Sequence, residues 1–173
     1  MSRIKVAKNF YLDEFIDPHT YFNTVDHGLS LMDPRVFEIV QLLRDHYGKP
    51  IYINNWWGYY SNYKDKLPLE KIISNIEKSN LHKWSGWRSS RCKIGASSSA
   101  HKKGKAADPK GPQKTFFSIV KRNAERFYAL GLRRLEDISI TIGWLHMDTL
   151  ERNTRPNSIR VVDRVKCTQT ITW

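Results

Sequence analysis

Two short stretches of this chain hold residue types that bind metal ions. The first is Ser99-Ala100-His101-Lys102-Lys103-Gly104-Lys105-Ala106-Ala107-Asp108, and the second is Trp144-Leu145-His146-Met147-Asp148. Two neutral imidazoles and a carboxylate are ligands that a catalytic Zn²⁺ accepts, with a fourth position left for water. The two stretches together are therefore typical of a divided zinc site.

The step from His101 to Asp108 predicts a loop that enters a strand. Seven residues are too many for one turn of helix, and Gly104 permits the tight turn that would bring the carboxylate back beside the imidazole. Small Ala106 and Ala107 would let the strand lie deep in a sheet.

The second stretch has the period of a strand, which places Trp144, His146 and Asp148 on one face. A carboxylate two residues from a zinc-bound imidazole could accept a proton from metal-bound water and later deliver it to a leaving amine. Asp148 is therefore a candidate catalytic base.

Each of these residues also has an ordinary structural interpretation. A lone histidine on an apolar strand is more often a hydrogen-bonded core residue than a ligand, and Asp108 alone would suit a turn or a helix cap. The joint pattern S-x-H-x-x-G-x-A-x-D changes this balance, because five fixed positions rarely coincide at average amino-acid usage.

Helices are predicted on both sides of the first stretch. Asp33 and Pro34 begin an amphipathic pattern that ends near Gly48, with an aspartate cap and proline at the first helical position. A shorter helix is expected over 68–81, and another from Gly111-Pro112 to Gly131.

Strands are predicted mainly in the last third of the chain. The β-prone runs lie at 51–54, 135–142, 144–150, 158–162 and 168–173. Helices early and strands late predict an α+β domain built on a small antiparallel sheet packed by helices. We expect one domain over 1–173, with an elaborated loop region at 56–98 that carries function.

Composition limits the partners. No apolar run approaches the length of a membrane span, and the N-terminus lacks the apolar core of a signal peptide. The net charge of +12 favours polyanions, and ten of the Lys and Arg residues lie between 102 and 134. A solvated basic helix face explains this charge equally well.

Cys92 and Cys167 show no zinc-binding spacing, and a single disulfide bridge between them stays open.

The motif S-x-H-x-x-G-x-A-x-D followed by W-x-H resembles the signature of the LAS metallopeptidases. This superfamily includes zinc D-alanyl-D-alanine carboxypeptidases, phage L-alanyl-D-glutamate endopeptidases and the Hedgehog signalling domain. The resemblance implies that His101, Asp108 and His146 bind zinc on the open face of an antiparallel sheet. It also places Ser99 and Trp144 beside the ligands, contacting them or the substrate.

The stretch Trp84-Ser85-Gly86-Trp87-Arg88-Ser89 resembles the S-G-x-R-S element that precedes the first ligand in this superfamily. Family members use its arginine to stabilise the developing oxyanion, and the resemblance gives that role to Arg88. Further short matches extend the resemblance over most of residues 10–155 and favour a phage-encoded branch.

The chain departs from the carboxypeptidase pattern at Gly143, where those members carry the catalytic acid. Three other carboxylates remain as candidates. Asp148 ranks first, narrowly, and resembles the H-x-D ending of murein endopeptidases, while Asp137 and Glu136 resemble the more distant glutamate of the Hedgehog domain. Pro109 also replaces the usual aliphatic residue after the ligand Asp108, and is expected to distort the strand there.

The leading hypothesis is a zinc peptidase that hydrolyses an amide in bacterial peptidoglycan, as a phage lysin or virion component. It would be made in the host cytoplasm or carried on the virion beside other virion proteins, and it would act on the cell wall. Trp56, Trp57, Tyr59 and Tyr60 could line its substrate groove, although core packing suits the Trp pair equally.

Three alternatives belong to other classes. A catalytically silent, zinc-containing virion or wall-binding module is kept open by Gly143. An iron oxygenase uses similar ligands, but its histidine and carboxylate usually lie two residues apart in the sequence. Nucleic-acid binding has only the charge in its favour.

Overall fold

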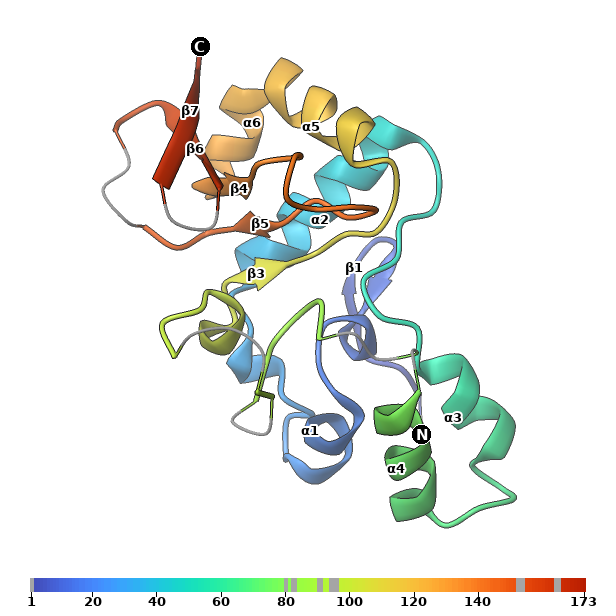
Figure 1. Cartoon of the computed structure of the whole chain (residues 1–173). Coiled ribbons are helices and arrows are strands. Elements are labelled where there is room, and N and C mark those ends of the chain that lie inside the picture. The colour runs from blue at the N-terminus through green and yellow to red at the C-terminus, as the bar shows by residue number, and fades with distance from the viewer. Residues whose placement is uncertain are drawn as a thin grey trace.

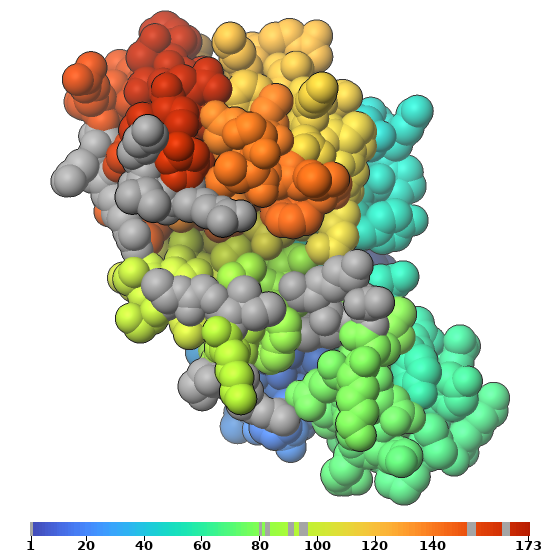
Figure 2. Space-filling view, viewed as in Figure 1, coloured from blue at the N-terminus to red at the C-terminus, as the bar shows by residue number. Residues whose placement is uncertain are grey.

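The structure, a computed structural model, describes residues 2–79, 81, 84–89, 92–93, 97–151, 155–163 and 166–173. It is an α+β arrangement, as the sequence predicts. A single buried cluster extends from Phe10 to Ile171 and includes side chains from both ends of the chain. In the space-filling view, residues beyond about 105 form most of the upper part with a cyan segment near residue 50 beside them, and other residues of the first half lie below (Figure 2).

The N-terminal half is mainly helical. A two-stranded hairpin is followed by short helices, the long helix α2 and, further on, the pair α3 and α4 (Figure 1). The elements are β1 (Lys5–Ala7), β2 (Phe10–Tyr11), η1 (Leu12–Glu14), α1 (Pro18–Asn23), η2 (Leu29–Leu31), α2 (Pro34–Tyr47), α3 (Trp57–Tyr63) and α4 (Leu69–Lys78).

The C-terminal half contains the main sheet. Its elements are η3 (His101–Lys103), β3 (Ala106–Ala107), α5 (Gln113–Arg122), α6 (Ala124–Ala129), β4 (Arg134–Glu136), β5 (Met147–Asp148), β6 (Ser158–Asp163) and β7 (Lys166–Thr172). The strand order is β3-β5-β4-β6-β7. Neighbours are antiparallel except β4 and β6, which run parallel.

Helix α2 confirms the prediction for 33–48. The Asp33 side chain accepts the Arg35 N–H at the start of the helix, and Gly48 ends it in the left-handed conformation with a φ of 72°. Asp33 also connects the helix to the sheet region, because its N–H donates to the Gly104 carbonyl and its carboxylate accepts the Thr149 hydroxyl.

Helices α2, α5 and α6 support the sheet. Contacts join α2 to α5 and β3, and α6 to β6 (Figure 1). The predicted helix over 111–131 is divided in two at Asn123, whose side chain donates to the Ile119 carbonyl. An asparagine that bonds to the backbone in this way competes with helical continuation.

Three predicted strands are shorter than expected. In the run 144–150 only Met147–Asp148 forms a strand, β5, and Trp144 makes an isolated bridge to Lys110. In 51–54 only Tyr52 makes a bridge, to Lys110, because Pro109 and Pro112 flank Lys110 and proline has no N–H to extend the pairing. The run 135–142 ends as a strand at Glu136, where the Asp137 carboxylate accepts the Ser139 N–H and starts a turn.

Two further expectations are settled by burial. Cys92 is buried and Cys167 is exposed, and both are free thiols, so the bridge left open by the sequence does not form. Trp56 is fully buried and donates its indole N–H to the Ile16 carbonyl, which favours core packing over a role in a groove.

In the described part of the chain, no helix combines the length and apolar character that crossing a bilayer requires.

Candidate metal centre

The sheet brings the two motifs together. Strand β3 pairs with β5 so that Ala106 lies opposite Asp148 and Ala107 opposite Met147. His101 lies in η3, one tight turn before β3, and Gly104 makes that turn with a φ of 66°. The loop-to-strand path predicted from the spacing is therefore observed, and β3 ends just before Asp108 and Pro109.

Three buried side chains converge at this point. His101 Nε2 lies 3.1 Å from His146 Nδ1, His146 Nδ1 lies 2.8 Å from Asp108 Oδ1, and His101 Nε2 lies 3.2 Å from the same oxygen. Metal–ligand bonds of about 2.0–2.1 Å give ligand separations of about 2.9 Å in octahedral and 3.3 Å in tetrahedral coordination. The cluster could therefore hold a first-row metal ion, and its two imidazoles disfavour Mg²⁺ and Ca²⁺.

In each histidine, the ring nitrogen that points away from the cluster, called here the outer nitrogen, already has a hydrogen-bond partner. His101 Nδ1 lies 2.6 Å from the Gly86 carbonyl, and His146 Nε2 lies 3.1 Å from Asp148 Oδ2. Because these oxygens accept hydrogen bonds, the two outer nitrogens carry the protons. His101 Nε2 and His146 Nδ1 are thus left to bind a metal ion.

Asp148 is held on the side of His146 that faces away from the ligand triangle. Its carboxylate forms an ion pair of 2.5 Å with Arg134, and it also accepts the Leu150 N–H. Burial raises the pKa of this carboxyl, but His146 and Arg134 outweigh burial and keep the pKa below its usual range. In this position Asp148 is suited to orient His146. It is less suited to accept a proton from the opposite side of the imidazole ring.

The cluster is electrostatically coupled. Burial raises the pKa of the Asp108 carboxyl, but His101 and His146 outweigh that effect and hold it well below its usual range. Burial lowers the pKa of His146, but hydrogen bonds to Asp108 and Asp148 raise it to about 10. Without a metal ion, a proton on the imidazole would stabilise the two carboxylates.

A cavity of about 360 Å³ borders Asp108 and is lined in addition by Arg88, Lys110, Trp144, Ser85, Ile142 and Gly143. The Arg88 guanidinium donates to the Trp84 carbonyl at 2.8 Å and lies 3.4 Å from Asp108 Oδ2. Arg88 and Trp144 thus lie where the sequence places them, beside the proposed ligand. Gly143 is exposed with a φ of 82°, and among the described residues that line the cavity Asp108 is the one acid.

The two remaining carboxylate candidates have different surroundings. The pairing of Arg134 with Asp148 and of Leu135 with Met147 brings Glu136 opposite His146, and the Glu136 N–H donates to the His146 carbonyl. By strand alternation, Glu136 shares a sheet face with Arg134 and His146. No side-chain hydrogen bond or ion pair engages Glu136 within the described residues.

The Asp137 carboxylate has hydrogen-bond partners outside the cluster. It accepts the Ser139 N–H and the Thr168 hydroxyl, each at 2.9 Å, and these hydrogen bonds lower its pKa. The Asp137 side chain projects from the opposite face of β4 to Glu136 by alternation. Ser99 is half-buried just before Ala100, and no hydrogen bond of its hydroxyl is observed among the described residues.

Two contributors escaped the sequence analysis. Arg134 could be found only from the register that pairs it with Asp148. Lys110 lies two residues after Asp108 and donates from Nζ to the Ser85 hydroxyl. Because residues two apart in an extended chain share a face, the spacing from Asp108 could have identified Lys110 from the sequence.

No family model, curated protein or solved structure matches this chain.

Proposed function

We propose that this protein is a zinc-dependent peptidase that hydrolyses an amide bond in the stem peptides of bacterial peptidoglycan. The observation that carries the proposal is the triangle of His101 Nε2, Asp108 Oδ1 and His146 Nδ1, of which Asp108 lines a cavity of about 360 Å³. Three protein ligands leave room for water or substrate, as in catalytic rather than structural zinc sites.

The surrounding residues have separate roles in this proposal. A bound zinc ion would supply Lewis acidity and lower the pKa of a bound water. Arg88, on the cavity wall next to Asp108, would stabilise the oxyanion of the tetrahedral intermediate. Asp148 and Gly86 hold the two histidines in the tautomers that binding requires.

Glu136 is our choice for the general base. It lies opposite His146 on the same sheet face and is not engaged by another described side chain, whereas Asp148 is paired with Arg134 and Asp137 with the following turn. This reverses the narrow preference for Asp148 that sequence reasoning gave.

We further propose that the protein is a phage lysin or a virion-associated wall hydrolase. The resemblance to phage-encoded peptidases and the net charge of +12 support this assignment, since a basic surface favours an anionic wall. A catalytically silent zinc module that binds the wall is the second candidate. It is favoured by Gly143, which has no side chain where the carboxypeptidases that the sequence resembles carry their acid.

The proposal can be tested with purified protein and peptidoglycan. We expect about one zinc ion per chain by elemental analysis, and release of new amino groups from peptidoglycan. His101→Ala should abolish both. Iron in place of zinc would overturn the metal assignment, while bound zinc without amino-group release would favour the silent module.

Two matched variants in the same assay identify the base. Glu136→Gln should retain the metal but lose activity by about 100-fold or more, the range expected for a general base. Asp137→Asn, one residue away on the opposite face, should keep nearly full activity. The reverse result would give the role of base to Asp137.

A further inference from the structure

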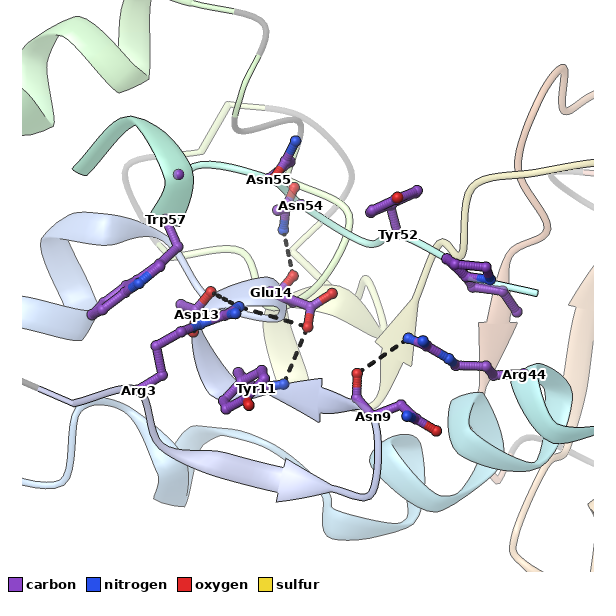
Figure 3. Close-up of a pocket in the computed structure, with 13 residues that line it drawn as sticks. Arg3, Asn9, Tyr11, Asp13, Glu14, Arg44, Tyr52, Asn54, Asn55 and Trp57 are labelled. Carbon is purple, nitrogen blue, oxygen red and sulfur yellow. Dashed lines mark hydrogen bonds and ion pairs between the residues drawn. The ribbon is translucent and has the colours of Figure 1, made fainter. Parts of the chain in front are cut away.

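A second cavity, of about 400 Å³, lies in the N-terminal half of the chain. We call it the N-terminal pocket, and Figure 3 shows it between β2, η1 and the segment 50–58. The residues used in the argument are Arg3, Tyr11, Asp13, Glu14, Arg44 and Tyr52. Its size lies within the range of small-ligand sites.

One backbone hydrogen bond connects the lining of the N-terminal pocket to that of the cavity beside Asp108. Tyr52 lines the former, Lys110 lines the latter, and the Lys110 N–H donates to the Tyr52 carbonyl at 2.8 Å. The two cavities are therefore neighbours along this bridge, and we infer that a polymer bound beside Asp108 extends toward the N-terminal pocket.

The charges on the pocket wall nearly cancel. Arg3 makes two hydrogen bonds to the Asp13 carboxylate, at 2.9 and 2.6 Å, and its guanidinium lies over the Tyr11 ring. Opposite them, Arg44 donates to the Asn9 carbonyl, and no ion pair of Arg44 is observed in the described ranges. A neutral ligand rich in hydrogen-bonding groups suits this balance better than an anion or a cation.

Glu14 is the group best placed to bind a hydroxyl. Its carboxyl points into the pocket, and one oxygen accepts the Tyr11 N–H at 3.1 Å (Figure 3). Burial raises the pKa of Glu14 to about 7. Near neutral pH the group can therefore both donate and accept, which is the capacity that a sugar hydroxyl matches.

The remaining walls carry amides and an aromatic ring. Asn54 and Asn55 line the pocket, and Asn54 donates to the Glu14 carbonyl. Tyr52 is 55% exposed, so a flat ring is available at the rim. Aromatic surface beside amide and carboxyl groups suits a ligand with one apolar face and polar edges.

We propose that the N-terminal pocket binds an N-acetylhexosamine unit of the peptidoglycan glycan strand. This inference rests on the proposed function, because the metal centre would act on peptides attached to that strand. The acetamide and hydroxyl groups of the sugar face the asparagines and Glu14, and its apolar face lies against Tyr52.

Titration with N-acetylglucosamine tetramer, followed by calorimetry and protein NMR, tests the proposal. The probe contains no peptide, so binding can be measured without turnover. We expect wild type and His101→Ala to bind equally, and Tyr52→Ala and Asn55→Ala to bind at least tenfold more weakly. Tyr63→Ala changes a half-exposed tyrosine outside the pocket and should bind as wild type does.

Several results would overturn the assignment. They are absence of tetramer binding to wild type, unchanged binding by both pocket variants, or equally tight binding of cellotetraose, which lacks the acetamide. Amino-group release from isolated stem peptides separates this inference from the proposed function. A protein that cleaves these peptides but does not bind the tetramer would refute the pocket and leave the peptidase intact.

Discussion

At the scale of single residues, the centre depends on the partners of the ligands as much as on the ligands. His146 is oriented by Asp148, and Asp148 is in turn held by Arg134 at 2.5 Å. The chain Arg134–Asp148–His146 fixes which ring nitrogen faces the metal site. Such outer partners typically contribute 10–100-fold to metal affinity.

Asp148→Asn should therefore weaken zinc binding by about 10–100-fold while the protein stays folded. Asparagine keeps the shape of the side chain but removes the charge that stabilises the His146 N–H and pairs with Arg134. Competition with a chromophoric chelator measures the affinity. Asp65→Asn, an exposed aspartate beside Lys64, is the matched control. Equal zinc affinity in all three proteins would contradict the orienting role.

The buried cluster of possible metal ligands could be predicted from sequence, but the choice of a proposed base could not. His101, Asp108 and His146 form a joint pattern with fixed spacing, whereas the choice among Glu136, Asp137 and Asp148 depends on sheet register. A shift of one residue along β4 exchanges the faces of Glu136 and Asp137. No feature of the local sequence specifies that register.

At the scale of elements, the turn between η3 and β3 sets the position of His101. Gly104 has a φ of 66°, and a Cβ placed there would lie 1.7 Å from the Leu31 carbonyl oxygen. That oxygen belongs to the backbone, so it cannot move aside as a flexible side chain would. The absence of a side chain at Gly104 allows the turn to pack against the segment before α2.

Gly104→Ala should reduce both stability and metal affinity, because the turn must shift to avoid the clash. Gly48→Ala provides the control, since Gly48 also has a positive φ, of 72°, but its Cβ would meet nothing within 4 Å. The free energy of unfolding of the control should fall by about 1–2 kcal/mol from backbone strain alone. Denaturant unfolding should show a larger loss for Gly104→Ala. Equal losses would mean that the close contact is unimportant.

Element prediction succeeded where local signals were strong. Helix α2 has an aspartate cap, a proline at its start and a glycine at its end, and each acts within a few residues. The strands were less predictable, because β4 pairs with β5 and with β6, and no local feature of the sequence specifies these partners. The parallel pairing of β4 with β6 likewise has no local signature.

At the scale of the whole molecule, a metal ion would connect parts of the chain that are distant in sequence. His101 and Asp108 flank β3, while His146 precedes β5. The buried core is continuous without the ion, so the fold should persist in its absence. An ion that binds only the folded state stabilises it by mass action, by about 4 kcal/mol at 1,000 times its Kd.

Removal of zinc by a chelator should thus lower the Tm by about 8–16 °C, given about 2–4 °C per kcal/mol for a chain of this size. Circular dichroism at 25 °C should still show a folded protein. In His101→Ala the chelator should leave the Tm unchanged. Complete unfolding of wild type at 25 °C would instead indicate that the metal ion is needed for folding.

The pairing of β3 with β5 also has a consequence for biosynthesis. Since the third ligand follows the second by 38 residues, a chain still being synthesised displays His101 and Asp108 long before His146 emerges from the ribosome. Two ligands bind metal weakly, and the triangle closes only when β5 docks against β3. Metal loading would therefore report that β5 has emerged and paired with β3, so that a chain truncated before His146 could not complete the triangle.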